Sequence, residues 1–298
     1  MRIATTTASE NIVRQIQQIN TQQTRLQSQV ASGLRLTQLE DDPAAAGRVL
    51  TLNTERRAID QFGNNANRAL EITQATFSSL MQIKKISDRA TELGTLGAGT
   101  QSSDQTNAYA SELDQLIEQS VQQANSRLRN DYTFAGTAVN TAPYTVTRDV
   151  NNKITAVNYV GNTNQIQIPL SDTASVSSGA DSATTQGIED FLNGLVAMRD
   201  ALAAGNNTAV TAAQTGLIAT EDVFVASLAQ QGAIEMRIEI NQAQQKDRLQ
   251  NLQQLISTEV DADMPTTIVR LNQAQLAYQA SLQSSASIMR ISLLDYIK

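Results

Sequence analysis

Residues 11–33 read NIVRQIQQINTQQTRLQSQVASG. Apolar residues recur along this stretch at alternating steps of four and three. That spacing is the a/d seam of a coiled coil, and it is narrower than the apolar face of a globular core helix. Gly33 and the loop that follows it, to Asp42, are expected to end the helix. The seam residues are Ile12, Ile16, Ile19, Leu26 and Val30, with Gln23 at the position between Ile19 and Leu26.

The carboxyl-terminal stretch carries a second narrow seam. Residues 266–296 follow a boundary at 261–265, and their apolar positions again recur at steps of three and four. The sequence therefore predicts that two Gln-rich helices, one from each end of the chain, pair with each other. The apolar positions are Ile268, Leu271, Tyr278, Leu282 and Met289, and Leu293 and Leu294 follow them.

Few charges flank either seam. Two arginines are the only charged residues between positions 11 and 33, and two more are the only ones between 266 and 294. A solvated coiled coil usually carries Glu and Lys beside its seam, and helices with one narrow seam bury little surface alone. We therefore expect the twelve seam residues named above to form an assembly interface, whose helices gain order on assembly. An ordinary intramolecular coiled coil is the alternative.

Longer helical patterns lie between the two seams. Asp42 and Pro43 predict the start of a helix that runs to about Leu93. Ser102 is expected to cap a third helix, whose apolar positions extend to Leu128. Helical spacing returns over 188–202 and over 210–256.

The period changes in the middle of the chain. Residues 144–147, 155–160 and 165–170 alternate between apolar and polar side chains, which predicts a small antiparallel meander. Residues 171–185 are rich in Ser, Ala and Gly and are interpreted as a loop.

Together these patterns predict a mainly α fold. We expect an elongated coiled-coil or helical-bundle rod, formed by the amino- and carboxyl-terminal regions, with a small inserted antiparallel β domain. Three parts are expected: a terminal coiled-coil assembly domain of residues 1–41 with 262–298, a long-helix bundle of 42–130 with 186–261, and an inserted β domain of 131–185.

Composition argues against most catalytic functions. The chain has no Cys and no His, which removes thiolate nucleophiles, zinc–thiolate sites and the commonest general base. A net charge of −7 and an aromatic content of 4% argue against nucleic-acid binding. No run of eighteen apolar residues is present, so no membrane insertion is expected. The first nine residues lack the apolar segment of a Sec signal peptide.

Local motifs have structural interpretations. The acidic clusters at 40–42 and 261–263 each precede a Pro that opens a helix, where carboxylates cap free N–H groups. The Gly94–Gly99 stretch lacks the Lys-Ser/Thr of a phosphate-binding loop and is interpreted as a turn between helices. We therefore expect no enzyme activity and assign no catalytic, cofactor-binding or metal-binding residue.

Several short motifs, taken in order, carry a family resemblance. They are Met1-Arg2-Ile3, Ser32-Gly33-Leu34-Arg35, the stretch from Asp41 to Ala46, Tyr132-Thr133-Phe134-Ala135-Gly136, the stretch from Tyr278 to Leu282, and the stretch from Ile291 to Tyr296. In this order they resemble the flagellin family of axial proteins, and within it the branch of hook–filament junction proteins, which has a YxFAG stretch. The likeness covers roughly residues 1–136 and 186–298.

The resemblance implies a structural protein of the bacterial flagellum without catalytic activity. It implies export through the flagellar type III apparatus with an uncleaved amino-terminal signal and a cytoplasmic chaperone, and a secreted, extracellular place at the hook–filament junction. Its terminal helices would form a ring of copies between hook-associated protein 1 and flagellin. The small β insert and Phe134-Ala135-Gly136 favour the junction branch. Flagellin, the filament subunit, and a cytoplasmic coiled-coil adaptor unrelated to flagella stay open as alternatives.

Overall fold

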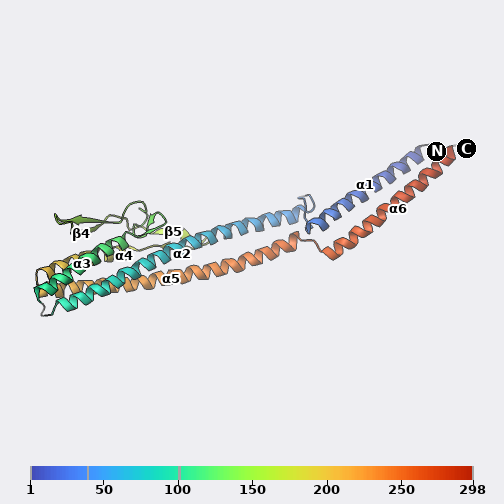
Figure 1. The fold of residues 1–298 in the computed structure, drawn as a ribbon. Helices are drawn as coiled ribbons and strands as arrows, with labels where there is room; N and C mark the ends of the chain where they lie inside the picture. Colours follow the sequence, from blue (N-terminus) through green and yellow to red (C-terminus); the bar gives the residue numbers. More distant parts are fainter. Residues whose placement is uncertain (1, 39, 100–101, 297–298) are drawn as a thin grey trace. The chain divides into compact units, whose positions relative to one another are not determined.

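A computed structural model describes residues 2–38, 40–99 and 102–296, and the side chains of those from 10 to 287. Helices predominate, and short strands lie between α3 and α4 along the chain (Figure 1). The predicted mainly α class with inserted antiparallel strands is confirmed. The helices are α1 (Arg2–Ser32), α2 (Pro43–Gly97), α3 (Ser103–Ala124), α4 (Ser182–Ala203), α5 (Asn207–Val260) and α6 (Met264–Tyr296). The strands are β1 (Arg127–Leu128), β2 (Asp131–Tyr132), β3 (Tyr144–Arg148), β4 (Ile154–Tyr159), β5 (Ile166–Pro169) and β6 (Ser175–Ser178).

Two helices start at the predicted capping residues. The Asp42 carboxylate accepts a hydrogen bond from the Ala45 N–H at 3.0 Å, and Pro43 is the first residue of α2. Ser102 and Gln105 form a reciprocal capping box before α3. These side chains satisfy N–H groups that the first turn of a helix leaves without partners.

The third helix ends earlier than its apolar pattern predicts. We expected Leu128 on this helix, but α3 ends at Ala124 and Leu128 lies in β1. Asn125 follows the helix, and its side chain binds both backbone groups of Tyr144, at 3.0 and 2.9 Å. An Asn side chain that satisfies a neighbouring backbone competes with continuation of a helix.

The sequence predicts that the second helix ends at about Leu93, before the Gly94–Gly99 stretch. In the structure α2 continues to Gly97. A Cβ added at Gly94 would lie 2.7 Å from Cε of Met198, and one at Gly97 would lie 2.2 Å from Cδ2 of Leu202. Met198 and Leu202 belong to α4. These glycines therefore allow two helices to approach closely, although each costs about 1 kcal/mol of helix propensity relative to Ala.

The predicted three-stranded meander is wrong. The described strands form three separate two-stranded antiparallel sheets, β1–β2, β3–β4 and β5–β6. β3 pairs with β4 as expected, with Tyr144 opposite Tyr159. β5 instead pairs with β6, which lies in the stretch predicted as a loop. The reason is burial, because Val176 of β6 packs with Ile168 of β5 in a small apolar cluster on α2 and α5.

Helices hold the strand pairs in place, since an isolated hairpin is marginally stable. Asn193 of α4 binds both backbone groups of Val157, at 3.0 and 2.9 Å. The buried Tyr144 hydroxyl donates to the Thr185 carbonyl at 2.9 Å. The β3–β4 pair is therefore anchored on α4 by polar contacts as well as by apolar packing.

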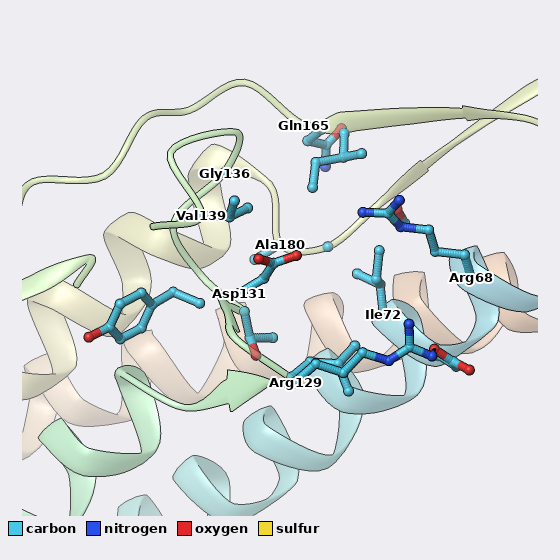
Figure 2. Close-up of a pocket in the computed structure, with 15 residues that line it drawn as sticks. Arg68, Ile72, Arg129, Asp131, Gly136, Val139, Gln165 and Ala180 are labelled. Atoms are coloured by element: carbon cyan, nitrogen blue, oxygen red, sulfur yellow. Dashed lines mark hydrogen bonds and ion pairs between the residues drawn. The ribbon is translucent and has the colours of Figure 1, made fainter. Parts of the chain in front are cut away.

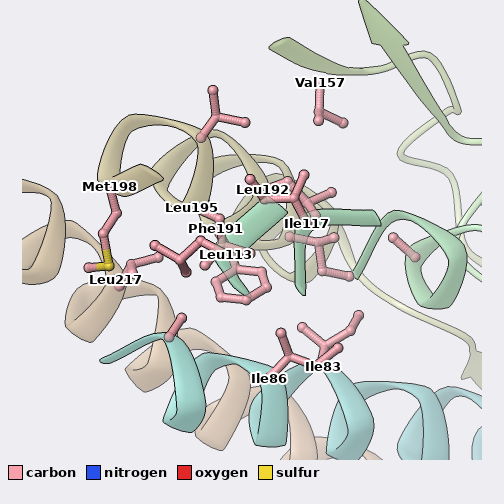
Figure 3. Packing of buried hydrophobic residues seen from close by; sticks show 14 of the residues in the cluster. Ile83, Ile86, Leu113, Ile117, Val157, Phe191, Leu192, Leu195, Met198 and Leu217 are labelled. Carbon is pink, nitrogen blue, oxygen red and sulfur yellow. The ribbon is translucent and has the colours of Figure 1, made fainter. Parts of the chain in front are cut away.

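The larger core is formed by α2, α3, α4 and α5 (Figure 3). Phe191 and Phe224 meet edge to face with ring centroids 5.4 Å apart. The Arg199 guanidinium, 5% exposed, donates to Asp114 at 2.9 Å and to the Ile154 carbonyl at 2.7 Å. A buried charge is tolerated there because its hydrogen bonds are satisfied.

The chain divides into two compact units, residues 1–58 with 247–298 and residues 59–246. We call these the terminal unit and the central unit. The boundaries fall inside α2 and α5. The finer division into three parts, with an assembly domain of 1–41 and 262–298, stays a prediction.

Gly97→Ala is expected to lower the free energy of unfolding by about 1–3 kcal/mol, because the added methyl must displace the buried Leu202 side chain. Gly216→Ala is the matched control on α5, where nothing lies within 4 Å of the new Cβ. It is expected to raise the free energy of unfolding by up to about 1 kcal/mol. Urea unfolding followed by circular dichroism measures both, and equal effects would contradict the close-approach role of Gly97.

Candidate assembly interface

α1 and α6 lie side by side within the terminal unit and run antiparallel (Figure 1). They are 31 and 33 residues long, so each spans about 45–50 Å at the α-helical rise. Every residue of the predicted interface belongs to one of these two helices. The pair is therefore the candidate functional site.

α1 turns its predicted seam toward α6. Leu26 is the most buried of the predicted residues, with 7% of its surface exposed. Gln23 occupies the polar seam position, and its buried Oε1 has no hydrogen-bond partner among the described residues. The other predicted residues, all half-buried, are Ile12, Ile16, Ile19 and Val30.

α6 faces α1 with a seam that differs in part from the predicted one. Leu271 and Tyr278 are half-buried in it, as are residues 264, 281 and 285. The most buried members are small: Thr267 is 8% exposed and Ala274 is 7% exposed. The steps of three and four are kept, but large side chains alternate with small ones.

Two predicted residues lie off this seam. Ile268 and Leu282 each follow a small seam position by one residue, which turns them by about 100° around the helix. They are 43% and 45% exposed. Val269 and Leu276 are exposed near them, at 54% and 67%. We call Ile268, Val269, Leu276 and Leu282 the outward stripe. The side chains of Met289, Leu293 and Leu294 lie outside the described residues.

A cluster of contacts joins the turn after α1 to the turn before α6. The Arg35 N–H donates to the Val260 carbonyl at 2.7 Å, and the Ala262 N–H donates to the Gly33 carbonyl at 2.9 Å. Gly33 has a φ of +74°, which favours glycine at this helix end. We call these contacts, together with the Arg48–Glu259 pair described next, the clasp.

Side chains reinforce the clasp. Arg48 binds Glu259 through two hydrogen bonds of 2.9 Å, and Arg35 donates to the Glu259 carbonyl at 2.7 Å. The hydrogen bonds from Arg48 lower the pKa of the Glu259 carboxyl. The Ala45 N–H likewise lowers the pKa of Asp42. The capping role predicted for the 40–42 cluster is thus met by Asp42.

Asp41, next to this cap, has a different role. Its carboxylate accepts hydrogen bonds from the backbone of Thr37 and Gln38, at 3.0 and 3.1 Å, and pairs with Arg25 of α1 at 3.0 Å. Burial alone would raise the pKa of Asp41, but these hydrogen bonds outweigh it and lower the pKa. Asp41 therefore ties the loop after α1 back to that helix.

Sequence reasoning did not find Arg48 or Glu259. They are 211 positions apart, so no local spacing connects them. Arg35 did belong to one of the family motifs, and Gly33 of the same motif was expected to end the first helix, so the sequence carried a partial signal for this part of the site.

Metal-binding clusters and membrane-spanning helices are absent from the described residues. Within the described part of the chain, no three His, Cys, Asp or Glu side chains are grouped so that they could hold a metal ion. Of the described helices, none has the length and apolarity to cross a membrane. The outward stripe is an exposed apolar face of α6 within the described residues.

The fold defines a class: an α-helical subunit whose two ends pair with each other and whose strands are inserted between helices. Residues 3–143 match the family model described as the bacterial flagellin N-terminal helical region. This match covers slightly less than half of the chain, and it confirms the resemblance to the flagellin family found in the sequence.

Individual relatives are distant. The flagellar filament 41 kDa core protein of Borreliella burgdorferi is 28% identical over 96 residues, which are 32% of this chain and 29% of that protein. The match thus spans less than a third of this relative.

Two solved structures share the fold. One, from Vibrio parahaemolyticus and assigned to the flagellar hook-associated proteins, has a TM-score of 0.66 at 15% identity and covers 74% of this chain and 100% of its own. The other, flagellar hook-associated protein-3 from Legionella pneumophila, has a TM-score of 0.58 at 11% identity and covers 70% and 98%. At these identities the likeness concerns the fold alone.

Acidification is expected to open the clasp. The pKa values of Asp41, Asp42 and Glu259 are lower in the folded chain than their ordinary values of 3.8, 3.8 and 4.5. Such groups stabilise the fold above the unfolded pKa, and this contribution is lost as the pH falls through the folded pKa. Amide protection factors of Arg35 and Ala262, measured by NMR, should therefore fall below about pH 4.

Glu259→Gln is the control for this prediction. It removes one of the three titrating carboxylates, so the protection factors of Arg35 and Ala262 should depend less on pH than in the parent chain. An unchanged pH dependence would contradict the role given to Glu259.

Proposed function

We propose that this chain is a structural subunit of the bacterial flagellum at the junction between hook and filament. It joins hook-associated protein 1 to the flagellin filament and acts by assembly of its terminal helices, without catalysis. The family match supports the flagellar role. The Tyr132–Gly136 motif and the short β region support the junction position. The observation that carries the proposal is the outward stripe, an apolar face of α6 that α1 does not cover.

In the proposed mechanism, two faces of α6 have different roles. The inner seam holds α6 on α1 within one copy, and the outward stripe packs against neighbouring copies in a ring. Full burial of an aliphatic side chain contributes about 1.5–3 kcal/mol. The outward stripe has four such side chains, each between 43% and 67% exposed in the single chain. Neighbours can therefore add substantial stability to helices that bury little surface alone.

The proposed partners follow from the same position in the flagellum. They are hook-associated protein 1 on one side, flagellin on the other, further copies of this chain in the ring, and a cytoplasmic chaperone before export. The proposed location is the extracellular flagellum, reached through the type III apparatus with an uncleaved amino-terminal signal.

Flagellin itself is the second candidate function. The relative from Borreliella burgdorferi is named as a filament core protein, which favours this alternative. Both candidates predict assembly through the outward stripe, so an experiment in flagellated cells is needed to distinguish them.

Leu282→Asp is expected to abolish incorporation into flagella while the helices stay folded, because the residue is exposed in the single chain and would be buried in the ring. Ser284→Asp is the matched control, because it places the same charge on an exposed position about 200° around the helix from Leu282, away from the outward stripe. Immunoblots of purified flagella measure incorporation, and circular dichroism measures folding. Normal incorporation of the Leu282 variant would contradict the proposed interface.

Deletion of the gene in a flagellated cell tests the junction position directly. Electron microscopy should show hooks without filaments, and flagellin should accumulate in the medium. Loss of filaments without shed flagellin would favour the filament subunit instead. Normal filaments and normal motility would overturn both flagellar proposals and favour a cytoplasmic adaptor.

A further inference from the structure

A cavity of about 190 Å³ lies beside β5 and β6 in the central unit (Figure 2). Arg68 and Asp131 lie on opposite sides of it, and Arg129 pairs with Glu71 at 2.7 Å. The cavity is smaller than the 300–1,000 Å³ typical of sites for drug-sized ligands, and it has room for an aliphatic side chain. Its apolar walls are Ile72, Leu128, Val139, Ile166 and Ala180.

One polar group of the cavity wall lacks a partner. Ser178, 2% exposed, lines the cavity, and its hydroxyl makes no hydrogen bond to any residue that the structure describes. Buried hydroxyls are usually satisfied, because leaving one without a partner costs free energy. The wall therefore has a donor available to a visiting backbone or side chain.

A fully exposed apolar side chain that the cavity could accommodate projects elsewhere in the same unit. Val150, at the turn between β3 and β4, is 100% exposed, whereas the next most exposed large apolar side chain of those described is 67% exposed. The turn is held rigid, because the Asp149 carboxylate accepts hydrogen bonds from the N–H groups of Asn151 and Lys153, at 2.9 and 2.8 Å. Docking a rigid tip costs little conformational entropy.

The hairpin points away from the cavity of its own chain. At its base Tyr144 binds Asn125, the residue just after α3, and at its tip Lys153 pairs with Asp114 in the middle of α3 at 2.9 Å. The hairpin therefore runs along α3 from its carboxyl-terminal end toward its amino-terminal end. The cavity lies beyond the carboxyl-terminal end of α3, at Leu128. Only another molecule can bring a Val150 into it.

We propose that Val150 of one copy inserts into this cavity of a second copy. Asp149, beside the inserted side chain, then meets Arg68 at the rim, and the backbone of the turn reaches the Ser178 hydroxyl. The contact is head-to-tail, so repetition gives a closed ring or an open helical array. The inference rests on the proposed function only in requiring that copies meet side by side.

The absence of native Cys allows a direct test by disulfide cross-linking in the full-length chain. Val150→Cys protein is mixed with Val139→Cys protein, in which the new thiol lies in the cavity wall, and the mixture is oxidised. Thr147→Cys replaces Val150→Cys in the matched control, because it is an exposed position on the same hairpin, three residues before the tip. We expect the cross-linked heterodimer to form at least about tenfold more with Val150→Cys than with Thr147→Cys.

The outcomes separate this inference from the proposed function. Equal cross-linking by the two hairpin variants overturns the inference, and it leaves the function standing if Leu282→Asp still blocks incorporation. Specific cross-linking supports the contact even if the deletion strain grows normal filaments. Circular dichroism of each Cys variant verifies that it is folded, and Ala180→Cys, on another wall of the cavity, replaces Val139→Cys should that variant fail to fold.

Discussion

The terminal unit depends on one long-range closure, the clasp, in which residues near α1 bind residues near α6 across more than 200 positions of sequence. Closing a loop of this length costs chain entropy, although the cost grows only with the logarithm of its length. Exposed ion pairs such as Arg48–Glu259 contribute little by themselves. The clasp therefore sets the register of α1 and α6, and the apolar seams beyond it supply most of the stability of the pair.

The helices could be predicted from sequence because apolar spacing and capping residues agree along most of the chain. The face of α6 that its partner helix covers could not be predicted in this way. On α6 the larger residues Ile268 and Leu282 continue the steps of three and four, whereas the structure buries the small residues Thr267 and Ala274. Periodicity finds an apolar stripe but does not show which stripe a partner helix covers. Small residues that alternate with large ones allow facing helices to interdigitate, and a pattern of large apolar residues gives them no weight.

Long-range contacts explain the remaining differences. β6 was missed because its four residues are mostly Ser, and the burial of Val176 opposite Ile168 of β5 stabilises them as a strand. Gly94 and Gly97 were interpreted as a break because local propensity disfavours glycine in helices, yet Met198 and Leu202 need the space. The clasp was missed for the same reason as β6. Each of these features is set by a residue far away in the sequence.

The two faces of α6 also suit the proposed assembly in energetic terms. The inner seam alternates large and small residues and buries little apolar area, so the α1–α6 pair is only weakly stabilised within one copy. The outward stripe carries large aliphatic side chains. Burying them between copies, as the proposed assembly requires, adds stability to the helix pair and leaves the contacts between α1 and α6 intact. In the proposed assembly, a subunit built in this way would gain much of its terminal stability from its neighbours. Under the proposed function, the helix pair is therefore most ordered in the position where it acts.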